Sequence, residues 1–316
     1  MAIDRRTIIS GPAILTFRGA TFYTTGGITV DPGITLGQII TDQHGKVDDF
    51  LDNIVSTVTF TPAGQWIPAH IDVLYPYRTP QIGSSIFGAT DDDVVIQSLD
   101  GQRLTLKTGG ITQMPALSLS AIRPPFGQCT ITCIGANDTE WTDTAKRAVL
   151  AAQAFADASF RRDQIKMAAY YASLAGATGG WGEFSAAEGW TITPEVQTYA
   201  IDTDAEGTCD IRLAGVNLTA SCIPVGITES EMLAQLPFQG ANIRRGQRLS
   251  KFGKDLTIAG KESGDPTVTI KSAVLTNAPF IYNAQSLRNG EAVFQSSVSF
   301  NDGGLMQPLF TLGLVA

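Results

Sequence analysis

The stretch TVTFTPAG at residues 57–64 has a counterpart in TASCIPVG at residues 219–226, and this pair sets the interpretation of the whole chain. Each is typical of a strand that ends at a Pro-x-Gly turn. Three further pairs follow in the same order: GQRLTL at 101–106 with GKDLTI at 253–258, PALSL at 115–119 with PTVTI at 266–270, and Asn-Asp at 137–138 and 301–302. We therefore predict one fold that is used twice.

The composition is that of a β-rich chain with many turns. A length of 316 residues is enough for two domains, each with its own core. Only 16% of the residues are charged and 32 are glycine, which suits strands joined by turns. The net charge of −8 gives no general attraction to nucleic acid. No apolar run approaches the roughly 20 residues of a membrane helix, and the start does not match a signal peptide. We expect no membrane association and synthesis in a reducing cytoplasm.

We predict a mainly β fold with two tandem sandwich or barrel domains, at residues 1–140 and 183–316, each with one short flanking helix. The first helix is expected at residues 66–75 and ends before Pro76. The second begins at Thr228, with Glu231 placed three residues later to complete a capping box. The Ala-rich residues 143–160 and residues 167–174 also predict helices. Residues 141–182 are therefore expected to be a helical connector.

Catalytic motifs are absent from the sequence. His44 and His70 lie in dissimilar contexts, and there is no nucleophile elbow and no phosphate-binding glycine loop. Residues 202–207 begin like a calcium loop, but Leu213 stands where the required twelfth-position acid should be. We favour a polar turn there. The sequence thus predicts no enzyme activity, no metal and no cofactor.

Two charged clusters and one cysteine pair leave alternatives open. Three consecutive acids are interpreted as a solvated acidic surface rather than a metal or catalytic site: Asp91, Asp92 and Asp93. One basic cluster either contacts an acidic patch on another copy or is an ordinary solvated loop: Arg244, Arg245 and Arg248. Cys209 and Cys222 flank a predicted turn at residues 214–217. They either face each other across a hairpin or are simply buried thiols.

The residues of the first half resemble a known family. VTFTPAGQW at 58–66, a short helix running into LYPY at 74–77, and IFG at 86–88 resemble the tail tube (major tail) proteins of long-tailed bacteriophages. The similarity continues through residues 100–101, 114–115 and 126–127. It covers most of residues 10–137, and the internal repeat extends it to about residues 185–316. The resemblance implies two tail-tube-like domains whose strands join a barrel around a central channel.

The same resemblance implies how copies of the chain would assemble. Three chains would form a pseudo-hexameric ring, and rings would stack head to tail into a tube. The partners implied are other copies, other phage tail proteins, and viral DNA that passes through without specific binding. The location implied is the virion tail, with assembly in the bacterial host cytoplasm. Three chains of −8 each carry −24 per ring, which suits a lumen that must not bind DNA. Asp91, Asp92 and Asp93 are candidates for that acidic surface.

The resemblance also implies an extended arm that reaches the neighbouring ring. Residues 26–53 are the candidate arm of the first half, and residues 183–206 are the candidate arm of the second half. The candidate contact residues of the first arm are Thr35, Asp42, His44, Asp48, Asp49 and Asp52.

Two other functions remain open. A tail hub or distal tail ring would use similar domains but stop at one ring. A carbohydrate-binding, host-recognition sandwich would need aromatic residues on loops, and the sequence hint for it is Trp141, Trp181 and Trp190.

Overall fold

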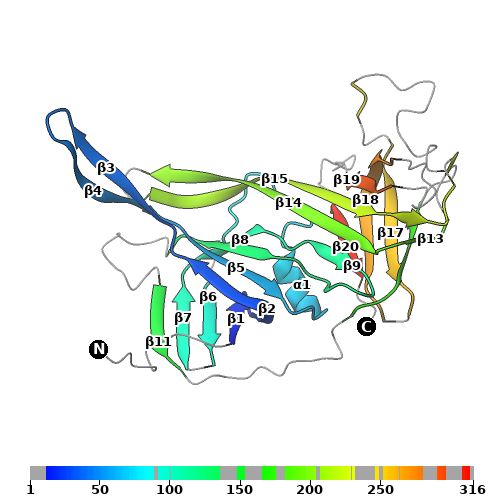
Figure 1. Ribbon diagram of the computed structural model, residues 1–316, viewed down its shortest axis with the longest axis horizontal. Helices are drawn as coiled ribbons and strands as arrows, with labels where there is room; N and C mark the ends of the chain where they lie inside the picture. The colour runs from blue at the N-terminus through cyan, green and yellow to red at the C-terminus, as the bar shows by residue number, and fades with distance from the viewer. Residues whose placement is uncertain are drawn as a thin grey trace.

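The fold is mainly β, as the sequence predicts. The computed structural model describes residues 12–88, 92–99, 101–135, 148–153, 166–175, 182–203, 207–228, 230–231, 246–248, 252–262, 264–279, 290–296 and 308–313. Strands β1 to β11 are called the first half of the chain, and β12 to β20 are called the second half. Each half contributes one large antiparallel sheet (Figure 1).

The first sheet has the strand order β11-β7-β6-β1-β2-β5-β10-β8. Its strands are β1 (Ala13–Phe17), β2 (Ala20–Asp31), β5 (Ser56–Pro62), β6 (Val94–Ser98), β7 (Gln102–Leu106), β8 (Gly109–Gln113), β10 (Cys129–Cys133) and β11 (Ala148–Ala152). In Figure 1, β6, β7 and β11 run across the direction of β2, β5 and β8, so the sheet forms two crossing layers. A separate hairpin, β3 (Ile34–Thr41) with β4 (Gly45–Ile54), projects from it.

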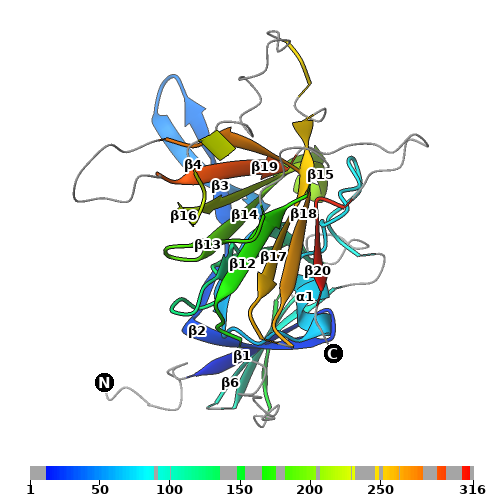
Figure 2. The same cartoon turned by 90° about the vertical axis from the view of Figure 1, so that its right-hand side faces the viewer.

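The second sheet has the order β16-β13-β12-β17-β18-β19-β15-β14-β9, with β20 paired to β18. Its strands are β9 (Leu117–Leu119), β12 (Tyr170–Leu174), β13 (Phe184–Ala186), β14 (Trp190–Thr203), β15 (Gly207–Cys222), β16 (Pro224–Val225), β17 (Lys254–Gly260), β18 (Thr267–Asn277), β19 (Ala292–Ser296) and β20 (Phe310–Gly313). Figure 2 shows β12, β17, β18 and β20 crossing β14 and β19. Strand β9 comes from the first half, so the two halves share a sheet.

Each strand pairing of the first sheet has a counterpart in the second. The matching pairs are β1–β2 and β12–β13, β1–β6 and β12–β17, β6–β7 and β17–β18, β7–β11 and β18–β20, β2–β5 and β14–β15, β5–β10 and β15–β19, and β8–β10 and β18–β19. An irregularity also recurs, because β10 shifts register against β8 and β18 shifts register against β19.

The pairings correct two of the sequence correspondences. Strand β7 matches β18, because β7 pairs with β6 and β11 while β18 pairs with β17 and β20. The stretch at residues 101–106 is therefore not equivalent to that at 253–258, and β9 is not equivalent to the start of β18. Short strands led by Gly or Pro look alike, so the sequence match slipped by one hairpin. Pro62 and Pro224 do occupy equivalent places, opposite Thr24 and Ala186.

The helical connector is wrong where it can be checked. Ala148–Ala152 is strand β11 at the edge of the first sheet, paired with β7. Tyr170–Leu174 is strand β12, paired with β13 and β17 of the second sheet. Pairing with an existing strand outweighs the weak helix preference of alanine. Apart from Gln153, whose amide donates to the Gly101 carbonyl at 2.9 Å, the remaining residues of the predicted helix at 143–160 lie outside the described residues.

Helix α1 (Pro68–Leu74) is where the sequence predicts it. A proline in its first turn favours the start, because the first amides of a helix need no internal acceptor. It buries Ile71 and Leu74, and the His70 ring lies 4.9 Å from the Phe22 ring of β2. Tyr75, just after the helix, stacks edge-on against Phe310 of β20 with ring centroids 5.6 Å apart. The helix and the residue that follows it therefore contact both halves.

The capping box of the second predicted helix is present. The Thr228 amide donates to Oε2 of Glu231 at 2.8 Å, and the Glu231 amide donates to Oγ1 of Thr228 at 3.3 Å. The Thr228 hydroxyl also donates to Oε2 of Glu231 at 2.7 Å, and the two bonds from Thr228 to this carboxyl lower the pKa of Glu231. The rest of the predicted helix, beyond residue 231, lies outside the described residues.

The hairpin predicted around residues 214–217 does not form. Strand β15 runs without a break from Gly207 to Cys222, so Cys209 and Cys222 lie on one strand and do not face each other. Strand β15 pairs instead with β14, and the outermost pair of this hairpin is Thr203 with Gly207. Residues 204–206 of the predicted polar turn lie outside the described residues.

Candidate assembly arm

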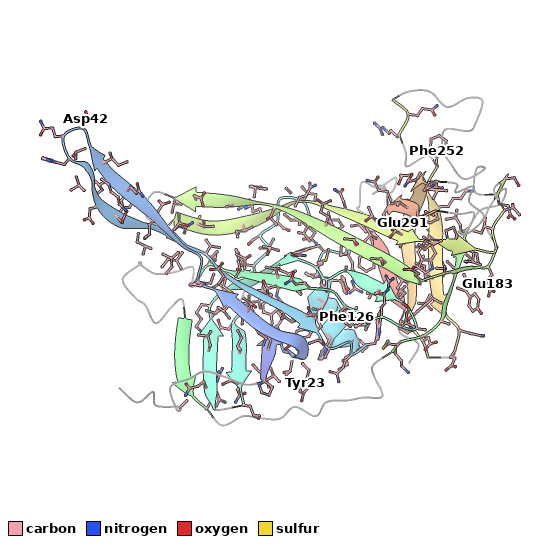
Figure 3. The ribbon with its side chains drawn as sticks, in the orientation of Figure 1. Tyr23, Asp42, Phe126, Glu183, Phe252 and Glu291 are labelled. Carbon is pink, nitrogen blue, oxygen red and sulfur yellow. The ribbon has the colours of Figure 1, made fainter. Side chains whose placement is uncertain are left out.

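The hairpin of β3 and β4, residues 34–54, projects away from the body of the molecule (Figure 1) and is called the first arm. Its strands pair from Ile34 with Ile54 out to Thr41 with Gly45. Asp42 marks the far end of the arm in Figure 3. Among the described residues, no other strand joins this two-stranded sheet. A lone hairpin of this kind is only marginally stable in water, so its edges and faces are available to a partner.

The first arm carries most of the large apolar side chains that the described residues expose. They are Ile34, Leu36, Ile39, Ile40, Val47, Phe50 and Leu51. Several large apolar side chains exposed on one projecting element mark a contact site. Sequence reasoning missed these residues because Gly- and Pro-rich turns made the region look like a loop. Ile34, Leu36 and Ile40 are spaced by even numbers of residues, and this spacing was the signal that could have revealed a strand.

The predicted contact residues of the arm are spread along it. Thr35 lies on β3, Asp42 and His44 lie at the tip, and Asp48, Asp49 and Asp52 lie on β4. At the tip, the His44 amide donates to Oγ1 of Thr41 at 3.2 Å. Asp49 forms an exposed ion pair with Lys46 at 2.7 Å. The acids therefore sit on the same hairpin as the apolar patch, and the arm presents both kinds of contact.

The base of the arm is tied to the second half. Nδ2 of Asn53 donates to Oγ1 of Thr208 at 2.7 Å, and Oγ1 of Thr208 donates to Asp202 at 2.7 Å. The Thr208 amide also donates to Oδ1 of Asn53 at 3.4 Å. These bonds fix the point where the arm leaves the body, so the direction of the arm is set by the fold.

The predicted acidic surface is largely neutralised where it is described. Asp92 forms an ion pair with Arg18 at 2.6 Å, and Asp93 pairs with Lys107. The two acids thus point to different partners, while Asp91 lies outside the described residues. In the predicted basic cluster, Arg248 is exposed, and Arg244 and Arg245 lie outside the described residues.

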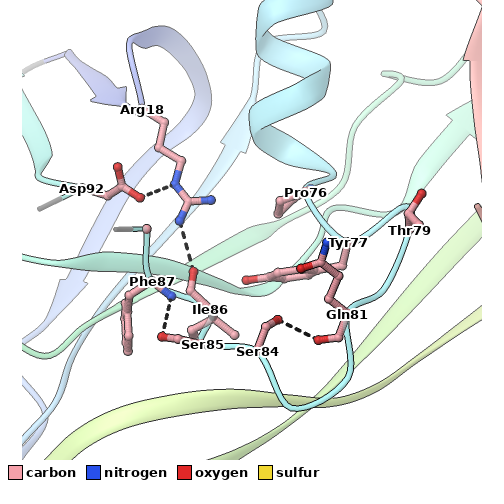
Figure 4. A pocket seen from close by; sticks show the side chains of 11 residues that line it. Arg18, Pro76, Tyr77, Thr79, Gln81, Ser84, Ser85, Ile86, Phe87 and Asp92 are labelled. Carbon is pink, nitrogen blue, oxygen red and sulfur yellow. Dashed lines mark hydrogen bonds and ion pairs between the residues drawn. The ribbon is translucent and has the colours of Figure 1, made fainter. Parts of the chain in front are cut away.

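The Arg18–Asp92 pair lines an open cavity of about 640 Å³ (Figure 4). A second Arg18 nitrogen donates to the Ile86 carbonyl at 3.1 Å. The remaining polar lining comes from hydroxyl and amide side chains such as Thr79, Gln81 and Ser84. The two charged side chains that line this cavity, Arg18 and Asp92, therefore neutralise each other, and neither is left as an unpaired charge for catalysis or for binding an ion.

The described residues give no support to a sugar-binding surface or a metal site. Trp190 is only 1% exposed and packs between Phe184 and Phe294, so it cannot offer a sugar-binding face. Trp141 and Trp181 lie outside the described residues. Over the part of the chain that the structure describes, no three His, Cys, Asp or Glu side chains gather as metal ligands. Within that part, no helix is long and apolar enough to span a membrane.

The fold and the arm together define a class: a β protein with two similarly paired sheets and a projecting apolar hairpin. No protein-family model matches the chain, and a comparison with curated proteins found no match. The features of the molecule that bear on its function are therefore the arm and the recurring strand pairings.

Proposed function

We propose that this chain is a structural protein of a bacteriophage tail tube. Three chains form a pseudo-hexameric ring, and rings stack through the first arm into a tube that conducts DNA. The observation that carries the proposal is the arm itself, since seven large apolar side chains on a projecting hairpin are exposed to water in a single chain. Burying them against another molecule is the strongest driving force for association that this surface offers.

The recurring pairings support the ring. Two units of similar topology in one chain allow three chains to supply six similar wedges. Head-to-tail contacts between such rings do not close, so they extend into a filament. Neighbouring copies and other tail proteins are the partners in this proposal, the virion tail is the location, and assembly takes place in the bacterial host cytoplasm.

The charge of the chain supports a conduit rather than a DNA-binding protein. With a net charge of −8, the chain as a whole repels a polyanion instead of attracting it. DNA then slides along the lumen without specific contacts. The proposal assigns the protein no catalytic step and no cofactor.

Electron microscopy of the purified protein tests the proposal. Long hollow filaments are the expected result. Discrete rings that never stack would favour a hub or distal tail ring, and a monomer that binds glycans would favour host recognition.

A pair of substitutions tests the role of the arm. Ile40→Asp places a charge on the apolar patch, and Ile122→Asp makes the same change at an exposed position outside the arm. We expect Ile40→Asp to abolish filaments while the subunit stays folded by circular dichroism, because a charge opposes burial of the patch. Ile122→Asp serves as the control and should still form filaments. Normal filaments from Ile40→Asp would remove the arm from the assembly contact.

A further inference from the structure

The outer part of the β14–β15 hairpin, residues 196–216, is equivalent to the first arm and is called the second arm. Thr203 pairs with Gly207 as Thr41 pairs with Gly45, and Thr198 pairs with Leu213 as Leu36 pairs with Leu51. Both arms also shift register twice, at matching places. Positions in the two arms therefore correspond one to one, 162 residues apart.

The two arms differ in what covers them. Residues 83–86 of the first half lie along the outer edge of β15. The Gly83 amide donates to the Leu213 carbonyl at 2.8 Å, the Leu213 amide donates to Ser84 at 2.9 Å, and the Ile86 amide donates to Ile211 at 2.9 Å. Leu213 is fully buried, whereas its counterpart Leu51 is 46% exposed. In the chain as described, no segment runs along the corresponding edge of β4.

A second contact between the halves shows the same asymmetry. Strand β9 pairs with the start of β14, where Leu119 lies opposite Trp190 and Leu117 lies opposite Ile192. Val30 lies opposite Val58 as Ile192 lies opposite Ala220, and Thr29 lies opposite Thr59 as Thr191 lies opposite Ser221. Ile28 and Val30 of β2 are therefore the counterparts of Trp190 and Ile192. Among the placed residues, no strand pairs with β2 on that side at Ile28 to Val30.

We propose that the second half of another copy of this chain covers both open edges, by adding backbone to β4 at Asp49–Leu51 and to β2 at Ile28–Val30. Within one chain, segments of the first half cover the strand edges of the second half. Between chains, the second half of one copy covers the open strand edges of the first half of the next copy. The inference rests on the proposed self-assembly and names the lateral partner within the ring. The tip of the arm, with Asp42 and His44, stays available to the adjacent ring.

Geometry and charge support a second copy as the occupant. Backbone groups alternate in direction along an antiparallel strand. Because the Leu213 amide and carbonyl point toward residues 83–84, those of Leu51 point away from β3 and are available for strand addition. The acids Asp48 and Asp49 lie on this part of the arm, and the second half presents the exposed Arg248. Opposite charges at such a contact favour the correct pairing.

Hydrogen exchange of the wild-type protein tests the proposal without a variant. Assembled protein is compared with dissociated subunits, and peptides that contain Leu51 and Leu213 are followed by mass spectrometry. We expect assembly to slow exchange around Leu51 at least about tenfold. The Leu213 peptide is the internal control, because residues 83–86 already protect it in the single chain. Unchanged exchange at Leu51 in assembled protein would overturn the proposal.

Two substitutions on the same hairpin supply an independent test. Leu51→Asp alters the edge assigned to the lateral contact, and Leu36→Asp makes the same change directly opposite on β3, at a position even more exposed than Leu51. We expect Leu51→Asp to raise the concentration needed for half-maximal ring formation at least about tenfold, with the circular dichroism of the subunit unchanged. Leu36→Asp should form rings at the wild-type concentration, measured by mass photometry.

The outcomes separate this proposal from the proposed function. Wild-type rings that never stack would reject the tube and leave the lateral contact in place. Wild-type filaments together with normal ring formation by Leu51→Asp would reject the lateral contact alone. A wild-type chain that stays monomeric at every concentration would reject both.

Discussion

At the scale of single residues, burial controls the chemistry of the cysteines. Cys129, Cys133 and Cys222 are buried, and Cys209 is half-buried. Burial raises the pKa of the Cys133 thiol to about 12 and raises those of Cys129 and Cys222 further. The reactive thiolate is therefore scarce at these three positions at neutral pH.

We predict that a maleimide at pH 7.5 modifies Cys209 first in the native protein. The three buried thiols should react only on global unfolding. Raising the pH to 9 should not convert them to reactive thiolates, because their pKa values lie well above that pH. Mass spectrometry of the labelled peptides over time measures the order, and the denatured chain provides full labelling for reference. Early modification of Cys129 would show that the first sheet opens locally.

The acidic cluster shows why single residues were hard to predict. The sequence suggested three solvated carboxylates, but Asp92 pairs with Arg18, which lies 74 residues earlier in the chain. Asp93 pairs with Lys107 across a strand connection. Such partners meet only through the fold, so no local pattern reveals them. The acids of the arm were easier to locate, because their strand pairs with its sequence neighbour.

At the scale of elements, Gly33 separates the first arm from its sheet. Its φ is +60°, and a Cβ there would lie 1.8 Å from the Val55 carbonyl oxygen. Its amide donates to Oδ1 of Asp31 at 2.9 Å, which stabilises the bend. The equivalent position in the second half is Glu195, where β14 continues without interruption. The first arm is therefore a distinct hairpin, whereas the second arm is the continuation of sheet strands.

We predict that Gly33→Ala lowers the melting temperature more than Gly45→Ala does. Both glycines have positive φ, which costs a residue with a side chain roughly 1–2 kcal/mol. Only at Gly33 does the new Cβ also meet backbone, since nothing lies within 4 Å of the one at Gly45. Differential scanning fluorimetry measures the difference. Equal melting temperatures would mean that the bend at Gly33 relaxes freely.

The elements with strong local signals were predicted well from the sequence. The run that ends at Pro62 and Gly64 located β5, and Pro76 together with the spacing of Ile71 and Leu74 located α1. Strand β11 was missed because an Ala-rich segment has a helical preference that only its pairing with β7 overrides. The continuity of β15 was missed because Gly215, a turn signal, lies in the middle of a long strand.

At the scale of the whole molecule, one apolar core joins the two halves. The buried cluster runs from β1 and β2 through α1 to β18 and β20. The Tyr75–Phe310 contact lies at the junction, and the Leu309 amide donates to the Arg78 carbonyl at 2.7 Å beside it. Together with the insertion of β9 into the second sheet, this makes independent unfolding of the halves unfavourable.

We predict that Phe310→Ala destabilises both halves together. Removing a fully buried phenylalanine lowers the free energy of unfolding by about 3–5 kcal/mol. Because the two halves share a core, the variant should still unfold in a single transition. Urea unfolding followed by tryptophan fluorescence and by circular dichroism should give coincident curves. Thr311→Ala, at the exposed neighbouring position on β20, should change the unfolding free energy by less than about 0.5 kcal/mol. Two separate transitions in Phe310→Ala would contradict a common core.

The sequence revealed that landmarks recur, but not how the halves meet. Strand β9 inserts into the second sheet, and residues 83–86 cover the edge of β15. Both arrangements depend on contacts between segments far apart in the chain. A pattern within one strand carries no information about a neighbour contributed from elsewhere. This is also why the landmark pairs at β7 and β9 were matched one hairpin out of place.

The divergence of the two arms has a consequence for how rings would be oriented on one another. Where the first arm has Ile40, Phe50 and Leu36, the second has Asp202, Arg212 and Thr198. In the proposed ring of three chains, apolar first arms would alternate with more polar second arms. Successive rings would then have three equivalent rotational settings instead of six, because a rotation by one wedge would place apolar side chains against charged ones.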